Sequence, residues 1–502
     1  MPMQRRFRSN AVVGIAFVTY LGVAFDILQS ILKTPRYGRY VRHIELNRSP
    51  SMDIGFVKVY KMKNPQRSLE AKDLERLKTA IRRCCFDSPE ERAKMLNILL
   101  QSPASMGYHD RRAPFLAQAL AALLVSVSPQ LESLDLCPVS REPSQLAQQT
   151  AQVGDSTLFR KTDYFFKHFL DRANSSNQQE TMPFLQNLRE VRFLVDVDIK
   201  SQYEYYYQPY DLYGSLNLVR RLPAVESIRV DAIMTPKESS DQPPAGSANY
   251  TRIIIRNSSL DYPYLVGAIE SAKQLEEFTY AIGGRGARHG LLGMFSPNHV
   301  LRALLLHRDS LVHLDLDVEA ETLLHHIFDP TLRQQFPFSD DEYERSVGFH
   351  NVYHGWGDRL EELTAVDGSL ASWSGSSSCS LRGFTKLKNL SLGIHLLYYL
   401  ARGIGPDQVE DESFAIVDHL PPNLESLSIY GYEEGMRGLR PFHRQLEQLL
   451  AEKDKKLPRL VYIEGIDELI ENAATVRRPD LNRHLLWEGE TDCEWTDHED
   501  YD

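Results

Sequence analysis

The sequence predicts an α/β protein in which short parallel strands alternate with helices and stack into an elongated, curved array. Three observations support this prediction. An apolar triplet, spaced apolar-x-x-apolar-x-apolar, recurs along the chain. Segments with the apolar period of a helix precede several of its copies. The length of 502 residues also exceeds that of one ordinary compact domain, which favours a repeat array or several domains.

Copies of the triplet made of leucine distinguish the repeat from chance. At 42% hydrophobic residues the loose pattern arises often, whereas three leucines at this spacing are expected less than about once. The strict copies are Leu131/Leu134/Leu136, Leu311/Leu314/Leu316, Leu387/Leu390/Leu392 and Leu424/Leu427/Ile429. Looser copies are Val41/Ile44/Leu46, Leu188/Val191/Phe193, Val225/Ile228/Val230, Tyr250/Ile253/Ile255, Leu275/Phe278/Tyr280, Leu360/Leu363/Ala365 and Leu460/Ile463. Because the copies at 225, 250 and 275 start 25 residues apart, they match the about 20–29 residues of leucine-rich repeats.

The spacing also predicts which side chains form the core. Helical periodicity over 115–127, 300–305 and 446–450 places a helix before three of the strands. In an extended strand alternate side chains share one face, so the last two apolar positions of each copy enter a common core. The residues between them face outward. We therefore expect an irregular leucine-rich-repeat-like solenoid with its helices on the convex side and outward strand residues on a concave surface.

The predicted organisation has three parts. Residues 1–30 form an apolar N-terminal segment, 31–486 the repeat array, and 487–502 an acidic disordered tail with eight acids and no Lys or Arg. The uncharged run from Ala11 to Phe25 is too short for the about 20 residues of a membrane-spanning helix. A buried first helix is the favoured interpretation, and a secretory signal or membrane anchor is the alternative.

Composition excludes several classes of protein. The proportion of charged residues, 25%, is that of a folded chain, and the five cysteines do not form a disulfide scaffold. The formal charge of −11 disfavours nucleic-acid binding over the whole surface, although residues 1–100 hold 19 Lys and Arg against 9 Asp and Glu. We expect an intracellular protein, in cytoplasm or nucleus, without a cofactor and without nucleic acid as partner; membrane association through residues 11–25 stays an alternative.

Three segments carry a resemblance to a known family. These are TRIIIRNSSLDYPYLVGAIESAKQLEEFTYAI from Thr251, FDILQSILKTPRYGRYVRHIEL from Phe25 and LPPNLESLSI from Leu420. They resemble repeats of fungal F-box-associated leucine-rich-repeat-like proteins. The resemblance implies a right-handed solenoid that recognises substrates for an SCF-type ubiquitin ligase and binds a Skp1-type adaptor through an F-box. No LPxE-like F-box start stands before Phe25, so an F-box lost from the chain or encoded outside this sequence would have to account for the difference.

The favoured function is therefore a non-enzymatic scaffold that binds an unidentified protein partner. Its contact residues are expected on outward strand positions and in a tyrosine-rich insertion, since tyrosine offers large contact area at recognition surfaces. The candidates are Glu132, Asp135, Tyr205, Tyr206, Tyr207, Tyr210, His313, Asp315, Ser426 and Ser428. The alternative for the tyrosines is an insertion that packs on its own repeat.

The second hypothesis is an enzyme. A glycine-rich loop with two arginines follows a predicted strand and could cradle a phosphate. It comprises Gly283, Gly284, Arg285, Gly286, Arg288 and Gly290. A histidine-rich region could hold a metal, but its spacing matches no known ligand pattern. It comprises His325, His326, Asp329, His350 and His354. We expect neither to be a site.

Overall fold

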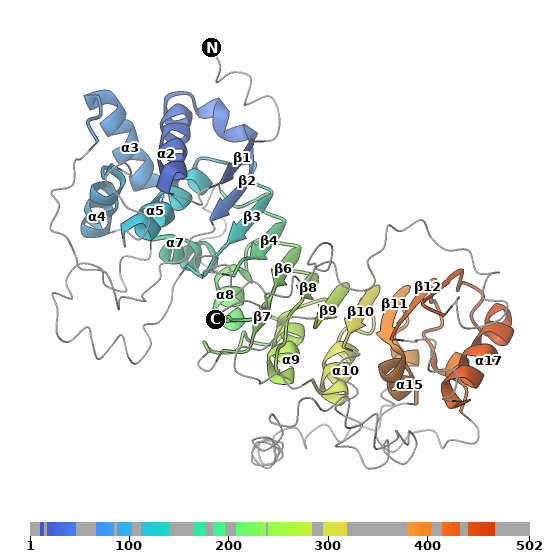
Figure 1. The fold of residues 1–502 in the computed structure, drawn as a ribbon. Helices are drawn as coiled ribbons and strands as arrows, with labels where there is room; N and C mark the ends of the chain where they lie inside the picture. Colours follow the sequence, from blue (N-terminus) through green and yellow to red (C-terminus); the bar gives the residue numbers. More distant parts are fainter. Residues whose placement is uncertain are drawn as a thin grey trace, which may run out of the picture. The chain divides into compact units, whose positions relative to one another are not determined.

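A computed structural model describes most of the chain. The described residues are 11–14, 18–46, 67–84, 88–102, 112–139, 165–175, 184–195, 207–236, 239–283, 295–318, 380–402, 414–431 and 440–466. They fall into two compact units. The first unit comprises Met1–Ile255 and Pro263–Leu275, and the second comprises Arg256–Tyr262 and Glu276–Asp502. Each unit combines a parallel sheet with helices along one side of its strands (Figure 1).

The first unit contains strands paired in the order β1-β2-β3-β4-β6-β8. Their bounds are β1 (Ala11–Gly14), β2 (Val41–Leu46), β3 (Ser133–Leu136), β4 (Glu190–Phe193), β6 (Ser227–Asp231) and β8 (Arg252–Arg256). The pairs from β1 to β6 are parallel. A separate small sheet pairs β5 (Gln208–Pro209) with β7 (Ile233–Met234).

Helices separate the strands of the first unit, as the periodicity predicts. They are α2 (Val18–Lys33), η1 (Pro35–Tyr40), α3 (Ala71–Arg83), α4 (Pro89–Leu99), α5 (Arg112–Ser126), α7 (Phe165–Ala173), α8 (Leu212–Val219) and α9 (Tyr262–Ser271). The helix expected over 115–127 is α5, whose inward side chains, such as Leu120 and Leu124, are fully buried. It packs against α2, α3, α4 and α7. The convergence of four helices on α5 explains why this helix is apolar on almost every side.

The second unit repeats the same alternation. Its strands pair in the order β9-β10-β11-β12-β13 and run parallel. Their bounds are β9 (Glu277–Ala281), β10 (His313–Asp317), β11 (Asn389–Gly393), β12 (Ser426–Tyr430) and β13 (Tyr462–Glu464). The helices are α10 (Pro297–Leu305), η7 (Leu381–Gly383), α15 (Ile394–Arg402), α16 (Ile416–His419) and α17 (Arg440–Lys456). The helices expected over 300–305 and 446–450 are thus α10 and α17.

The apolar triplets lie where the sequence predicts. In each strict copy the last two residues are buried in one strand, for example Leu134 and Leu136 in β3 or Leu314 and Leu316 in β10. Parallel register aligns them, since Leu314 pairs with Leu390 and Leu390 with Leu427. Each such leucine contributes about 1.5–3 kcal/mol through burial. The looser copies also form strands, except Leu360/Leu363/Ala365, which lies outside the described residues.

The N-terminal segment differs from the prediction in part. Residues Ala11–Gly14 form a strand that pairs with β2, and the helix begins only at Val18. The sequence AVVG carries two β-branched residues, which favour extended backbone beside an open sheet edge. The buried helix itself is confirmed, because Leu21, Phe25 and Leu28 of α2 are in the core. No helix in the described ranges is long and apolar enough to cross a membrane. Residues 487–502 lie outside the described part of the chain.

Two buried glutamines join neighbouring elements. The Gln118 amide on α5 donates to the Val139 carbonyl after β3 at 2.7 Å and accepts from the Phe166 N–H at the start of α7 at 3.3 Å. In the second unit, Gln445 on α17 donates to the Phe414 carbonyl and accepts from the Ile416 N–H of α16. Each glutamine thus gives a hydrogen-bond partner to one backbone carbonyl and to one backbone N–H. The N–H lies in the first turn of another helix, where it has no partner inside that helix.

Candidate functional site

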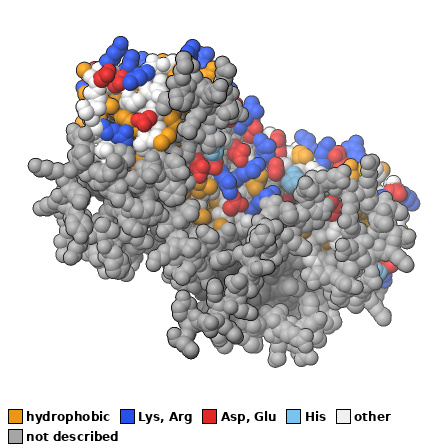
Figure 2. Space-filling view, turned by 45° about the horizontal axis from the view of Figure 1, so that its top comes forward, with side chains coloured by type: hydrophobic (Ala, Val, Ile, Leu, Met, Phe, Trp, Pro, Cys, Tyr) orange, Lys and Arg blue, Asp and Glu red, His pale blue; other side chains and the backbone are white. Residues whose placement is uncertain are grey.

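The candidate site of the first unit is the side of its sheet that faces away from the core. Side chains on this side alternate along each strand with the buried leucines and their equivalents. Parallel register brings equivalent positions together: Asp135 pairs with Arg192, and Arg192 with Arg229. We call this side the charged strand face. It comprises the outward strand residues Glu45, Asp135, Glu190, Arg192, Arg229, Asp231 and Arg252, together with Arg42, Glu132, Arg189 and Glu226, which lie at or just before the start of a strand. Figure 2 shows cationic and anionic side chains interspersed on the described surface.

Ion pairs between strands organise this face. Arg42 contacts Glu132 at 2.6 Å, and Arg229 contacts Glu190 at 2.9 Å. Two further pairs have N–O distances of 3.0 Å, namely Arg192–Asp231 and Arg252–Glu226. All are at least one-third exposed, so each contributes only about 0–1 kcal/mol to stability. The main effect of these ion pairs is therefore to hold the charged side chains in a fixed pattern on the strand face.

The structure places the predicted residues Glu132 and Asp135 on this face. Glu132 is exposed beside Arg42, whereas Asp135 is half-buried, and this burial raises the pKa of its carboxyl group. The charges on β4, β6 and β8 were not predicted as contacts. The sequence indicates that these charged residues face outward only if the copies Leu188/Val191/Phe193 and Val225/Ile228/Val230 are taken as strands.

A serine, a histidine and an aspartate meet on β2 and β3, which the sequence analysis missed. The His43 Nδ1 lies 2.6 Å from the Ser133 Oγ, and the His43 Nε2 lies 3.8 Å from the Asp135 Oδ2. The second distance is too long for the hydrogen bond that would orient the imidazole of a catalytic triad. Backbone N–H groups of paired strands are also used in the sheet and cannot stabilise an oxyanion there. The arrangement is a polar contact between strands.

In the second unit, the strand face holds the other predicted residues. His313 and Asp315 lie on β10, while Ser426 and Ser428 lie on β12, with β11 between the two strands. His313, Asp315 and Ser426 are half-buried, and Ser428 is buried. Tyr430, which was not predicted, reaches across β11 and donates its hydroxyl hydrogen to the Asp315 Oδ1 at 2.8 Å. The structure therefore brings the predicted strand residues of this unit onto one polar surface.

Burial controls the titration of Asp315. Desolvation raises the pKa of its carboxyl group, opposed by the Tyr430 hydrogen bond and by the nearby His313 and Arg256, while Glu277 reinforces the rise. The folded state then binds the proton more tightly than the unfolded state does. The contribution of Asp315 to the free energy of unfolding should therefore fall as the pH rises from its ordinary pKa through the raised one.

We expect Asp315→Asn to remove this pH dependence. An amide oxygen can still accept from Tyr430, and no charge needs to be desolvated. Relative to the unaltered chain, the urea midpoint of the second unit should be equal or higher at about pH 7, and the difference should shrink towards about pH 4. Asp309→Asn, at an exposed position of the same unit, is the control. A gain from D315N that grows on acidification would contradict the assignment.

The prediction that the tyrosine-rich insertion binds a partner is wrong for its described tyrosines, Tyr207 and Tyr210. Tyr207 is 1% and Tyr210 3% exposed, so neither is available on an accessible surface. The Tyr210 hydroxyl lies 2.9 Å from the Ser215 Oγ, and its ring packs beside Phe193. The insertion therefore folds onto its own unit, where the pairing of β5 with β7 holds it. Tyr205 and Tyr206 lie outside the described residues.

The enzyme candidates fall mostly outside the described chain. This applies to Gly284 and the rest of the glycine-rich loop, and to the histidine-rich region from His325 to His354. Gly283 is described and has a φ of +66°, and a Cβ atom there would collide with Asn257. Among the residues that the structure describes, no group of three or more His, Cys, Asp or Glu could hold a metal. The described cysteines, Cys84 and Cys137, are buried thiols.

Comparison of the chain with protein-family models, with curated proteins and with solved structures finds no match.

Proposed function

We propose that this chain is a protein-interaction scaffold, built as an irregular leucine-rich-repeat-like right-handed solenoid, that binds its partner through the polar strand faces. One observation carries the proposal: each sheet has an apolar side that contacts helices and a side of polar residues in register from strand to strand. Such a surface offers a fixed two-dimensional pattern of charge at the about 4.8 Å spacing of strands.

The ion pairs on the charged strand face favour specific binding of one partner over nonspecific electrostatic binding. Arg192 and Arg229 already have fixed acidic neighbours, so a partner of uniform negative charge must displace Asp231 and Glu190. A partner with acidic and basic side chains in the complementary order keeps each charge near an opposite one. Charge complementarity of this kind mainly gives specificity and a faster association rate.

The resemblance to fungal F-box-associated proteins supports a more specific form of the proposal. In that form the scaffold is the substrate-recognition part of an SCF-type ubiquitin ligase. Stoichiometric co-purification with a Skp1-type adaptor would support it. A retained protein partner without the adaptor would instead support a scaffold that acts outside such a ligase.

Charge reversal tests the strand face directly. We expect Arg192→Glu with Arg229→Glu to reduce recovery of the partner at least about tenfold, because two basic positions become acidic beside Asp231 and Glu190. The measurement is quantitative mass spectrometry of proteins co-purified with the full chain, with chemical crosslinks to locate the contact.

The control makes the same change in charge elsewhere in the first unit. Arg36→Glu with Arg39→Glu alters two exposed residues of η1 that are not part of the charged strand face, and it should leave recovery unchanged. Circular dichroism checks that both variants fold. Undiminished capture of the crosslinked partner by folded R192E/R229E protein would refute the proposed binding surface.

A further inference from the structure

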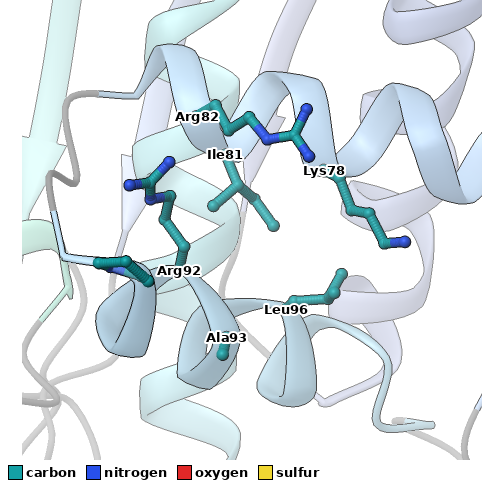
Figure 3. Close-up of a pocket in the computed structure, with 7 residues that line it drawn as sticks. Lys78, Ile81, Arg82, Arg92, Ala93 and Leu96 are labelled. Carbon is teal, nitrogen blue, oxygen red and sulfur yellow. The ribbon is translucent and has the colours of Figure 1, made fainter.

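A pocket with a positively charged rim lies between α3 and α4 of the first unit. Its volume is about 240 Å³, and it is open to solvent. It is lined by Lys78, Ile81, Arg82, Pro89, Arg92, Ala93 and Leu96. In Figure 3 the Arg82 and Arg92 guanidinium groups, from different helices, flank Ile81, and Lys78 lies on the side of Leu96.

The floor of the pocket is apolar because of how the two helices pack. α3 turns Leu77, Ala80 and Ile81 towards the core, and α4 turns Met95, Ile98 and Leu99. Between the helices, the small Ala93 lines the pocket together with Ile81 and Leu96. An apolar group that enters this space removes hydrocarbon surface from water on both sides.

None of the described residues that line the pocket is acidic. The acids near it on α4 point to other partners, since Glu90 pairs with Lys94 at 3.3 Å and Glu91 with Arg172 at 3.7 Å. Lys78 pairs with Glu75 at 2.7 Å, an exposed and therefore weak contact. Among the ion pairs of the described residues, none joins Arg82 to a carboxylate.

The start of α4 adds to this positive field. Pro89 lines the pocket at the first turn of the helix, where backbone N–H groups give a partial positive charge. The Arg92 Nε donates to the Ser88 carbonyl at 3.4 Å, and this hydrogen bond keeps the guanidinium group near the N-terminus of α4. Charge complementarity therefore favours an anionic occupant with an apolar part.

We propose that this pocket binds an acidic peptide segment of a protein partner, which inserts one apolar side chain over Ile81 and Leu96 and places flanking carboxylates against Arg82 and Arg92. The volume is below the roughly 300–1,000 Å³ of small-molecule sites, so it suits one side chain better than a cofactor. Arginine pairs carboxylates through two parallel hydrogen bonds. This binding site is separate from the strand faces, so failure of either assignment leaves the other intact.

A labelled model peptide tests the assignment. The probe is a fluorescein-labelled peptide with one leucine between runs of glutamate and aspartate, and its binding to the full chain is followed by fluorescence anisotropy. We expect Arg82→Gln with Arg92→Gln to weaken binding about tenfold or more, because both charge-assisted contacts are lost. Ala93→Glu, which puts a carboxylate in an exposed position of the pocket, should weaken it similarly.

Two controls separate the pocket from general attraction between opposite charges. Arg83→Gln removes the same charge from the same helix at a residue that does not line the pocket, and it should change the affinity less than about twofold. A peptide with serine in place of leucine should bind about tenfold more weakly to the unaltered chain. Circular dichroism monitors folding, and the serine peptide needs no variant of the protein.

The outcomes are distinguishable. Equal losses with R83Q and R82Q/R92Q, or equal affinity for the leucine and serine peptides, would overturn the proposal. So would a single-stranded oligonucleotide that binds as tightly as the peptide and depends on the same arginines, because the pocket would then be a general polyanion site. Loss of binding confined to the pocket variants and the serine peptide would support it.

Discussion

Leu314→Ala should destabilise the second unit by about 2–5 kcal/mol, the range for truncating a fully buried leucine. Leu314 is the central residue of a strict triplet on β10, paired with Phe278 of β9 and Leu390 of β11. Removing the Leu314 side chain leaves a cavity beside Phe278 and Leu390, which the hydrogen-bonded strands cannot close by moving together. Hydrogen exchange of amides in β9, β10 and β11 reports the loss within this unit, without assuming that the whole chain unfolds in one step.

The matched control is the adjacent residue. His313 lies on the opposite side of the same strand and is half-buried, so His313→Ala should change the free energy of unfolding by no more than about 0.5 kcal/mol. Similar losses from the two variants would mean that the two sides of β10 do not divide into core and surface, and the predicted alternation of buried and outward residues would be wrong.

Gly38→Ala should destabilise the first unit by about 2–3 kcal/mol. Gly38 is buried in η1, and a Cβ atom there would collide with the backbone carbonyl oxygen of Val127, after α5, and press on the Ile31 side chain of α2. A backbone oxygen cannot rotate away as a side chain can, so η1 must move relative to both helices. Thermal unfolding and hydrogen exchange over α2 and α5 measure the effect.

The comparison is Gly22→Ala, in the second turn of α2. A Cβ atom there meets no atom of the described residues within 4 Å, and alanine in place of glycine should stabilise the helix by about 0.5–1 kcal/mol. The same substitution should thus have opposite signs at two positions of one unit. A stabilising G38A would show that η1 does not approach α5 as closely as described.

Sequence periodicity predicted the strands well because each triplet is a local pattern with its own core side chains. Within the described residues, the copies from Leu131 to Leu424 are strands with the expected buried positions. It failed at Ala11–Gly14, where pairing with β2 outweighs an apolar run that is compatible with a helix. It also failed for Tyr207 and Tyr210, because composition does not reveal on which side of an insertion a tyrosine lies.

The side-chain contacts within the candidate sites could not be predicted from local sequence patterns. Arg192 meets Asp231 from 39 positions along the chain, and Tyr430 meets Asp315 from 115. Such contacts depend on strand order and register, which become definite only when every intervening element is placed. The pocket at Ile81 depends in the same way on how α3 and α4 pack, which the spacing of residues in the sequence does not reveal.

The buried glutamines have a consequence for how the chain opens. If α7 detached from α5, the Gln118 amide would lose its contact with the Phe166 N–H, and a buried polar group without a partner costs about 1–3 kcal/mol. Gln445 imposes the same penalty on α16 in the second unit. Fraying of a single helix is therefore coupled to its neighbour, so that adjoining segments should exchange their amide protons in concert.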